Sequence, residues 1–171
     1  FFVSSLRFST QSLIANTNLV TKIYFPRELF PLAAIISQLF DLAVASAALT
    51  VILTVAGIGV SVQLLWVPIL IAILVALALA LGFLFSALAL FFRDVKYLIE
   101  VILTFGIFFT PVFYNVELFG DWAPILMLNP VAPILEGLGA CIVHQQAPAL
   151  GWLAYSAVVS LVGLALSYKT F

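Results

Sequence analysis

The chain has 171 residues, of which 65% are hydrophobic and 8% are charged, and its mean hydropathy is +1.32. A soluble domain carries about 25% charged residues, so this composition excludes an ordinary soluble protein. No charged residue occurs from Leu42 to Phe92, whereas a helix crosses a bilayer with about 20 apolar residues. We therefore predict an all-α integral membrane protein. The net charge of −1 gives no indication of a nucleic-acid partner.

Residues 1–14 mix Phe, Leu and Ile with Ser, Thr, Gln and Arg7. We interpret this stretch as the inner end of a preceding span, and the alternative is an amphipathic helix on the membrane surface. The chain begins with Phe1 and shows no signal peptide. We therefore expect a piece of a longer protein that lacks at least one preceding span.

A basic segment bounded by prolines follows at Asn16–Leu32. It carries Lys22 and Arg27, and its prolines, Pro26 and Pro31, disfavour a continuous helix, so we predict that the chain turns twice here. Basic connectors of membrane proteins stay on the cytoplasmic side. The segment is therefore predicted to be a cytoplasmic loop that receives force from a partner.

Four complete transmembrane spans are predicted after this loop, because long apolar runs alternate with turns and charged connectors. They cover Ala33 to about Gly57, Leu64–Phe91, Tyr97 to about Tyr114, and Leu150–Tyr168. A tight charged connector between the second and third spans contains Arg93, Asp94 and Lys96. Together with part of a preceding span, these elements predict a polytopic helical bundle.

The distribution of basic residues supports this topology. Because the spans alternate in direction, all six basic residues fall on one side of the membrane: Arg7, Lys22, Arg27, Arg93, Lys96 and Lys169. The segment Tyr114–Gly151, on the other side, contains acidic residues but no Lys or Arg. Basic residues are retained on the cytoplasmic side during insertion, so residues 114–151 are predicted to be outside.

The outer segment is predicted to form two short helices. Asp121 can cap the run Trp122–Leu128, and Asn129-Pro130 is typical of a helix start. The run Val131–Val143, which contains Glu136, is too short to span, and apolar runs of about 10–14 residues often re-enter the membrane or lie at its surface. We predict an outer re-entrant hairpin of half-helices, and the alternative is an ordered extracellular loop packed on the bundle.

Sequence motifs for catalysis and metal binding are missing. The chain has no phosphate-binding glycine loop and no His-Glu helix motif, and neither Cys141 nor His144 has partners at metal-ligand spacing. We therefore predict no catalytic residue, no metal site and no cofactor bound by this chain. If a nucleotide drives transport, its hydrolysis must occur in a separate polypeptide.

Two acidic residues lie within the predicted spans. Asp41 shares a helical face with Ser37 and Gln38, and a charged residue at a helix centre costs about 2.5–3.5 kcal/mol on insertion scales. This face is predicted to meet protein or water, either as a polar lining or subunit contact or as a hydrogen-bonded structural group. Glu100 follows Lys96 by one helical turn, which predicts a local ion pair.

The third predicted span carries a stripe of aromatic residues. Phe105, Phe109 and Phe113 recur at helical spacing and lead to Tyr114, while Pro111 is predicted to bend the helix. Because flat aromatic rings can stack on sugars, we consider these aromatic residues, together with Asp41, part of a substrate path. Ordinary packing in the membrane is the alternative.

Small residues recur at four-residue spacing in the spans, for example Gly82 with Ser86 and Gly163 with Ser167. This spacing permits a close approach of helices in membranes. It also arises by chance in a chain as rich in alanine as this one.

Three segments, in this order, resemble one family of transporters. They are Asn18-Leu19-Val20-Thr21-Lys22-Ile23-Tyr24-Phe25-Pro26-Arg27, then Phe92–Tyr97 with Thr110–Tyr114, and finally Asn129-Pro130 through Glu136-Gly137. In their order and spacing, the matches cover nearly the whole chain. The pattern resembles the permeases of type-2 ABC exporters for polysaccharides, in particular exporters of O-antigen and of teichoic acid, a polyol phosphate.

The resemblance implies a six-span permease of the bacterial cytoplasmic membrane that forms a homodimer and pairs with two copies of a separate ATPase, which binds ATP and Mg²⁺. It also implies that the segment from Asn18 to Phe25 contains a coupling helix that docks on the ATPase. Lipid-linked polysaccharide would cross between the two permeases. Residues 1–171 are then expected to be a single permease domain without its first span and most of its second.

Three other functions fit part of the pattern. The same fold could export a drug or a small lipid. A fragment of an ion-coupled secondary transporter would need broken helices and coupling residues deep in the membrane, for which Asp41 is the candidate. The third alternative is a membrane anchor or assembly subunit without transport activity.

Overall fold

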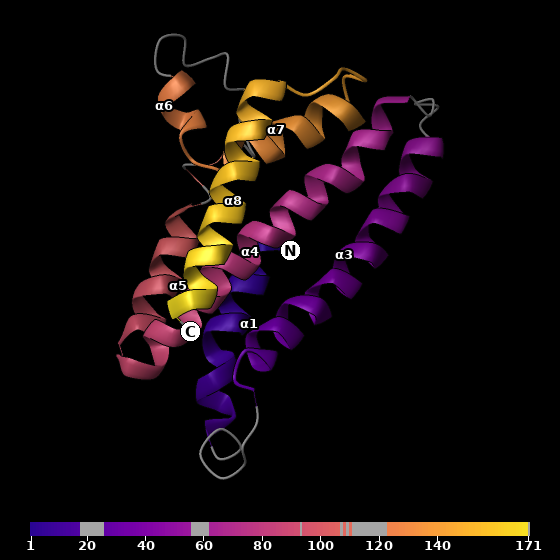
Figure 1. Cartoon of the computed structure of the whole chain (residues 1–171). Helices are drawn as coiled ribbons and strands as arrows, with labels where there is room; N and C mark the ends of the chain where they lie inside the picture. The colour runs from indigo at the N-terminus through magenta and orange to yellow at the C-terminus, as the bar shows by residue number, and fades with distance from the viewer. Residues whose placement is uncertain are drawn as a thin grey trace.

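The computed structural model describes residues 1–17, 26–55, 62–92, 94–106, 108, 110 and 123–170. This part of the chain is helical and contains no strand, which confirms the predicted all-α class (Figure 1). A short 3₁₀ helix, η1 (Val62–Leu65), precedes α4. The α-helices are α1 (Phe2–Ala15), α3 (Leu29–Val55), α4 (Trp66–Phe91), α5 (Val95–Gly106), α6 (Ala123–Met127), α7 (Val131–Ile142) and α8 (Leu150–Thr170).

Three of the described helical segments are long and apolar enough to cross a membrane. They are Leu29–Val55, Val62–Phe91 and Leu150–Lys169. They correspond to the first, second and fourth predicted spans, which confirms a helical membrane bundle. The third predicted span is described as α5 up to Gly106, and most of its outer half lies outside the described residues. The number of complete spans therefore stays a prediction.

Helix α4 is the centre of this bundle. Helices α1, α3, α5, α7 and α8 all pack against it (Figure 1). Its side chains are apolar around the whole circumference, which is typical of a helix buried in a membrane protein. Because lipid tails are as apolar as leucine, helices in a bilayer associate mainly through close packing. The shape of the α4 surface therefore determines which neighbours it can hold.

A glycine allows α1 and α3 to approach α4 closely. A methyl group added to Gly82 would lie 2.7 Å from Oγ of Ser9 on α1 and 2.9 Å from Cδ1 of Ile35 on α3. A looser contact of the same kind joins α4 to α8, where a methyl group on Gly163 would lie 3.4 Å from Cβ of Ala80. The predicted small-residue contacts at Gly82 and Gly163 are thus confirmed. Helix α1 packs within the bundle, as expected for the end of a span.

The entry to α3 differs from the prediction. The chain turns at Pro26–Glu28, where the amide of Leu29 donates to the carbonyl of Pro26 at 3.3 Å. Pro31, in contrast, is buried in the first turn of α3. Amide groups in a first turn have no partner within the helix, so a proline is tolerated there. The predicted second turn is therefore wrong, and the helix begins at Leu29 rather than at Ala33.

The outer segment forms two short helices, as predicted. Figure 1 shows α6 and α7 at one end of the bundle, opposite the end of α1, the start of α3 and the start of α5. The buried side of α7, including Ile134 and Cys141, joins a core cluster with Leu70 of α4 and Leu153 of α8. Cys141 is therefore a buried packing residue, as predicted. Helices α7 and α4 approach each other closely at Gly137, where an added methyl group would lie 3.0 Å from Cδ2 of Leu70.

One hydrogen bond connects the hairpin to α8. The hydroxyl of Tyr155 donates to the carbonyl of Leu128 at 2.9 Å. Its ring also meets Trp152 edge to face, with centroids 6.1 Å apart. This bond anchors the turn between α6 and α7 to a long membrane helix.

We expect Gly82→Leu to destabilise the contact of α1, α3 and α4, because the new side chain must displace Ser9 and Ile35. Overpacking of this kind costs about 1–3 kcal/mol. The measurement is the melting temperature of the purified full-length protein in detergent. Gly151→Leu is the matched control, since nothing lies within 4 Å of an added methyl group there. Equal melting temperatures for the two variants would contradict the proposed close contact.

We expect Tyr155→Phe to loosen the outer hairpin without disturbing the bundle. A lost hydrogen bond of this kind costs about 0.5–1.5 kcal/mol, so amide hydrogen exchange in residues 126–132 rises by up to about tenfold. Tyr168→Phe, at the opposite end of α8, is the control and leaves this exchange unchanged. If the two variants exchange at the same rate, Tyr155 does not anchor the hairpin.

Candidate functional site

The described residues include no group of three His, Cys, Asp or Glu side chains that could hold a metal ion. The candidate functional residues are instead polar and aromatic side chains on membrane helices and in the segments that connect them. They lie in four places: the connection from α1 to α3, the contact of α1 with α5, the exposed face of α3, and the outer hairpin.

The predicted coupling loop connects α1 to α3. Pro26 and Arg27 are exposed immediately before α3, and the amide of Phe30 donates to the carbonyl of Arg27 at 3.3 Å. Arg27 is therefore held one turn from the start of a long helix. The remaining predicted loop residues lie outside the described part of the chain: Asn18, Leu19, Lys22, Tyr24 and Phe25.

Basic residues gather at the same end of the bundle. Arg27 precedes α3, Lys96 lies in the first turn of α5 and Lys169 lies in the last turn of α8, and Figure 1 shows these three helix ends on one side. The carbonyl of Asp94 accepts the amide of Tyr97 at 3.1 Å, which starts α5. The predicted connector residue Arg93 lies outside the described residues. This end carries the charges expected of a cytoplasmic face.

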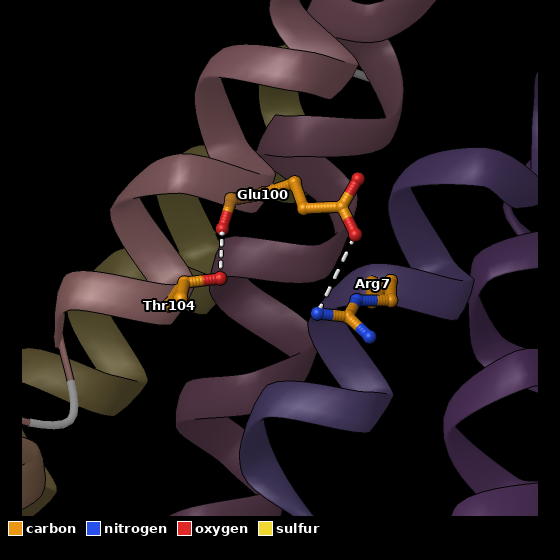
Figure 2. Close-up of polar contacts among 3 residues, drawn as sticks. All are labelled: Arg7, Glu100 and Thr104. Carbon is orange, nitrogen blue, oxygen red and sulfur yellow. Dashed lines mark hydrogen bonds and ion pairs between the residues drawn. The ribbon is translucent and has the colours of Figure 1, made fainter.

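An ion pair joins α1 to α5 (Figure 2). Nη2 of Arg7 lies 3.5 Å from Oε1 of Glu100, and the two side chains are 44% and 49% exposed. Thr104 donates its hydroxyl to the backbone carbonyl of Glu100 at 2.8 Å. The sequence neighbours Leu6 and Ile99 are buried in one apolar cluster. The charged pair therefore lies at the edge of an apolar contact between the two helices.

The predicted pair of Glu100 with Lys96 is wrong. Nζ of Lys96 instead lies 4.7 Å from the centroid of the Tyr97 ring. An ion pair one turn apart on a helix is worth only about 0.2–0.5 kcal/mol. A guanidinium on a neighbouring helix can therefore form the ion pair with Glu100 instead, as Arg7 does here.

The polar face of α3 is not covered by the described part of the chain. Asp41 is exposed, Gln38 is half-buried, and Ser37 donates its hydroxyl to the carbonyl of Ala33 at 2.9 Å. Ser37 is thus satisfied within its own helix. The described part of the chain therefore leaves the Asp41 side chain uncovered.

Helix α5 has one face on the bundle and a broad apolar face away from it. Ile99 and Leu103 are buried, whereas Phe105 and Phe108 are 61% and 67% exposed. Of the predicted aromatic path, Phe109, Phe113 and Tyr114 lie outside the described residues. Phe105 is therefore the one member of that stripe among the described residues, and its side chain is exposed.

Helix α7 of the outer hairpin begins as the sequence predicts. Oδ1 of Asn129 accepts the amide of Val131 at 3.1 Å, and Pro130 has helical φ and ψ of −64° and −16°. This side-chain bond satisfies an amide that the helix cannot. Glu136 is exposed on α7, whereas the residues on the opposite side are buried against the bundle.

Sequence reasoning missed the contact of Arg7 with Glu100. Residues so far apart in sequence give no spacing signal, because only the packing of α1 on α5 brings them together. The available signal was electrostatic, because an arginine within a membrane helix requires a partner. Glu100 is the acidic residue of α5.

Comparison with known proteins identifies the family. The model of the ABC-2 type transporter family matches residues 1–143. O-antigen export system permease protein RfbA of Klebsiella pneumoniae is 27% identical over 137 residues, which cover 79% of this chain and 53% of that protein. The protein of the same name from Myxococcus xanthus is 24% identical over 165 residues, 95% of this chain and 64% of that protein.

The chain thus spans between about half and two thirds of the length of these curated relatives. The family match includes every described helix from α1 to α7, and it agrees with the family expected from the three sequence segments. The chain belongs to the ABC-2 type transporter family.

Proposed function

We propose that the protein containing this chain is the permease subunit of an ATP-driven ABC exporter. Its cargo is lipid-linked polysaccharide, such as O-antigen, teichoic acid or a capsule-like glycan, which it moves across the bacterial cytoplasmic membrane. The observation that carries the proposal is the similarity, over most of the chain, to permeases named for O-antigen export. The basic residues Arg27, Lys96 and Lys169 lie at helix ends opposite α6 and α7 (Figure 1), which supports a cytoplasmic orientation of that end.

In this proposal, a separate ATPase subunit drives transport by pushing the loop between α1 and α3. The loop is basic, and the turn at Pro26–Glu28 leads directly into α3. Helix α3 runs without interruption from Leu29 to Val55, so a displacement at its inner end tilts the whole helix. ATP-driven closure of the ATPase subunits would thereby widen the seam between two permeases.

The exposed polar face of α3 supports a homodimer with a hydrated seam. A carboxylate such as that of Asp41 costs about 2.5–3.5 kcal/mol near the centre of a lipid-facing helix, and Asp41 is exposed in the isolated chain. A second copy of the permease, or water between two copies, removes this cost. The exposed ring of Phe105 supplies an aromatic surface on which a sugar ring could stack.

Affinity purification of the full-length protein from its native membrane tests the proposal. We expect a nucleotide-binding ABC ATPase to co-purify with the permease, and deletion of the permease gene to leave lipid-linked polysaccharide on the cytoplasmic side. A permease that co-purifies with no ATPase, in cells that export every glycan normally after the deletion, would rule the proposal out.

We expect Tyr24→Ala and Arg27→Ala to uncouple ATP hydrolysis from export. Removal of an interface anchor costs about 2 kcal/mol, which weakens docking of the ATPase about thirty-fold. The measurements are the amount of co-purified ATPase and the glycan exported per ATP hydrolysed. Lys169→Ala, which removes an exposed cation at the same end of the bundle, is the control and retains both. Unchanged export in both loop variants would count against the coupling role.

We expect Phe109→Ala to slow glycan export about tenfold, which corresponds to about 1.4 kcal/mol of lost contact in the passage. The variant retains the ATPase, because Phe109 is distant in sequence from the coupling loop. Phe91→Ala, which removes an exposed ring at the end of α4, serves as the control. If every tested glycan is exported at the normal rate by the Phe109 variant, stacking on this ring does not contribute.

A further inference from the structure

Helix α5 is attached to the bundle by a small contact. Its buried residues, Ile99 and Leu103, meet Leu6 of α1, and the same cluster includes Leu81 and Phe85 of α4. The contacts of α1 and α8 along α4 are far more extensive. Most of its other side chains, including Leu98, are exposed. The position of α5 therefore depends on a few interactions, and the ion pair of Arg7 with Glu100 is one of them.

The geometry of this ion pair is that of a contact that can open. A single nitrogen of the guanidinium meets a single carboxylate oxygen at 3.5 Å, and both side chains are nearly half exposed (Figure 2). For a pair whose two side chains are both partly exposed, we expect the shift in an equilibrium to be no more than about fivefold. It biases the position of α5 without fixing it.

Arg7 and Glu100 belong to helices that lead to different parts of the proposed transporter. Arg7 lies about 12 Å from the end of α1, at a rise of 1.5 Å per residue, and α1 leads into the coupling loop. Glu100 lies one to two turns into α5, which leads toward the aromatic stripe and the outer hairpin. A displacement of α1 would therefore act first on this pair and on the apolar contact beside it.

Gly106, at the end of α5, gives the helix a place to bend. Nothing lies within 4 Å of a methyl group added there, so close packing does not require glycine at this position. Glycine is the poorest helix former after proline, and Pro111, five residues further along the chain, lacks an amide donor. Gly106 and Pro111 thus disfavour a regular helix at the end of α5 and in the sequence that follows it.

We propose that Arg7 and Glu100 are positioning residues for transport. In the resting state their ion pair holds the inner part of α5 against α1. Displacement of the coupling loop moves α1, opens the pair and allows α5 to swing away about Gly106. This inference rests on the proposed function, because the ATPase partner supplies the displacement.

Thiol labelling beneath the ion pair tests the inference in the full-length transporter with its native cysteines, including Cys141, replaced. Leu103→Cys reports on the contact of α1 with α5, and Leu77→Cys in α4 is the matched control, because the two leucines are 9% and 3% exposed. In the resting state, Glu100→Gln should raise the maleimide labelling rate at Leu103→Cys by up to about fivefold. The rate at Leu77→Cys should not change.

Two further experiments distinguish a positioning role of the ion pair from a general effect on protein stability. The double exchange Arg7→Glu with Glu100→Arg should return the labelling rate at Leu103→Cys to its original value. ATP should raise this rate in the otherwise unaltered transporter, but not in Glu100→Gln, where it is already high. An unchanged resting rate in Glu100→Gln, an equal increase at Leu77→Cys, or a failure of the double exchange to restore the rate would overturn the inference.

The hinge is tested with two glycines in comparable surroundings. Gly106→Ala should reduce the ATP-dependent increase at Leu103→Cys. Gly139→Ala in α7 should not, although an added methyl group meets nothing within 4 Å at either position. Equal effects of the two substitutions would overturn the hinge. Failure of the proposed function would instead appear as a transporter that binds no ATPase, whereas the resting labelling rates are measured without nucleotide.

Discussion

A bilayer core solvates neither charges nor unpaired backbone groups, and this constraint arranges the described part of the molecule. Its backbone is helical, and Arg27, Lys96 and Lys169 lie at helix ends on one side. Charged residues within a span therefore require an explanation. Arg7 and Glu100 neutralise each other across two helices, and Asp41 lies on a face that the described chain leaves open. The residues proposed to function are thus charged groups within membrane helices, which a bilayer core disfavours.

The same constraint divides the bundle into a tight and a loose part. Association in lipid depends on close packing, and α4 provides it through Gly82, where α1 and α3 meet, and through Ala80, which lies against Gly163 of α8. Helix α5 has no comparable small-residue contact among those described, and it buries little of its surface. A force applied at the loop would therefore carry α1, α3 and α4 together, while α5 can change its position relative to them.

Local physics made much of this architecture predictable. The spans Leu64–Phe91 and Leu150–Tyr168 follow from continuous apolar runs, and the start of α7 follows from the capping residue Asn129 before a proline. Pro31 was misinterpreted because proline is excluded from helix interiors but tolerated in a first turn. In both successes the decisive interactions lie within a few residues of each other in the chain.

The contacts between helices were less accessible to sequence reasoning. The partner of Glu100 was assigned by spacing within one helix, whereas the packing of α1 on α5 determines it. The hydrogen bond from Tyr155 to Leu128 is likewise a tertiary contact without a local signal. The coupling residues from Asn18 to Phe25 and the aromatic residues Phe109, Phe113 and Tyr114 lie outside the described part, so their roles stay predictions.

An ion pair suits a moving contact in a membrane better than an apolar contact would. Two apolar surfaces that separate in a bilayer can be covered by lipid tails, so their opening creates no path for a polar molecule. When Arg7 and Glu100 separate, each charge must instead be solvated by water, because lipid would impose a cost of several kcal/mol, about 2.5–3.5 for a single charged residue on insertion scales. Opening of the contact between α1 and α5 would therefore leave both charges in water. The proposed cargo, a polysaccharide whose hydroxyl groups also require hydrogen-bonding partners, would likewise need a hydrated route, which the proposal places between two permeases.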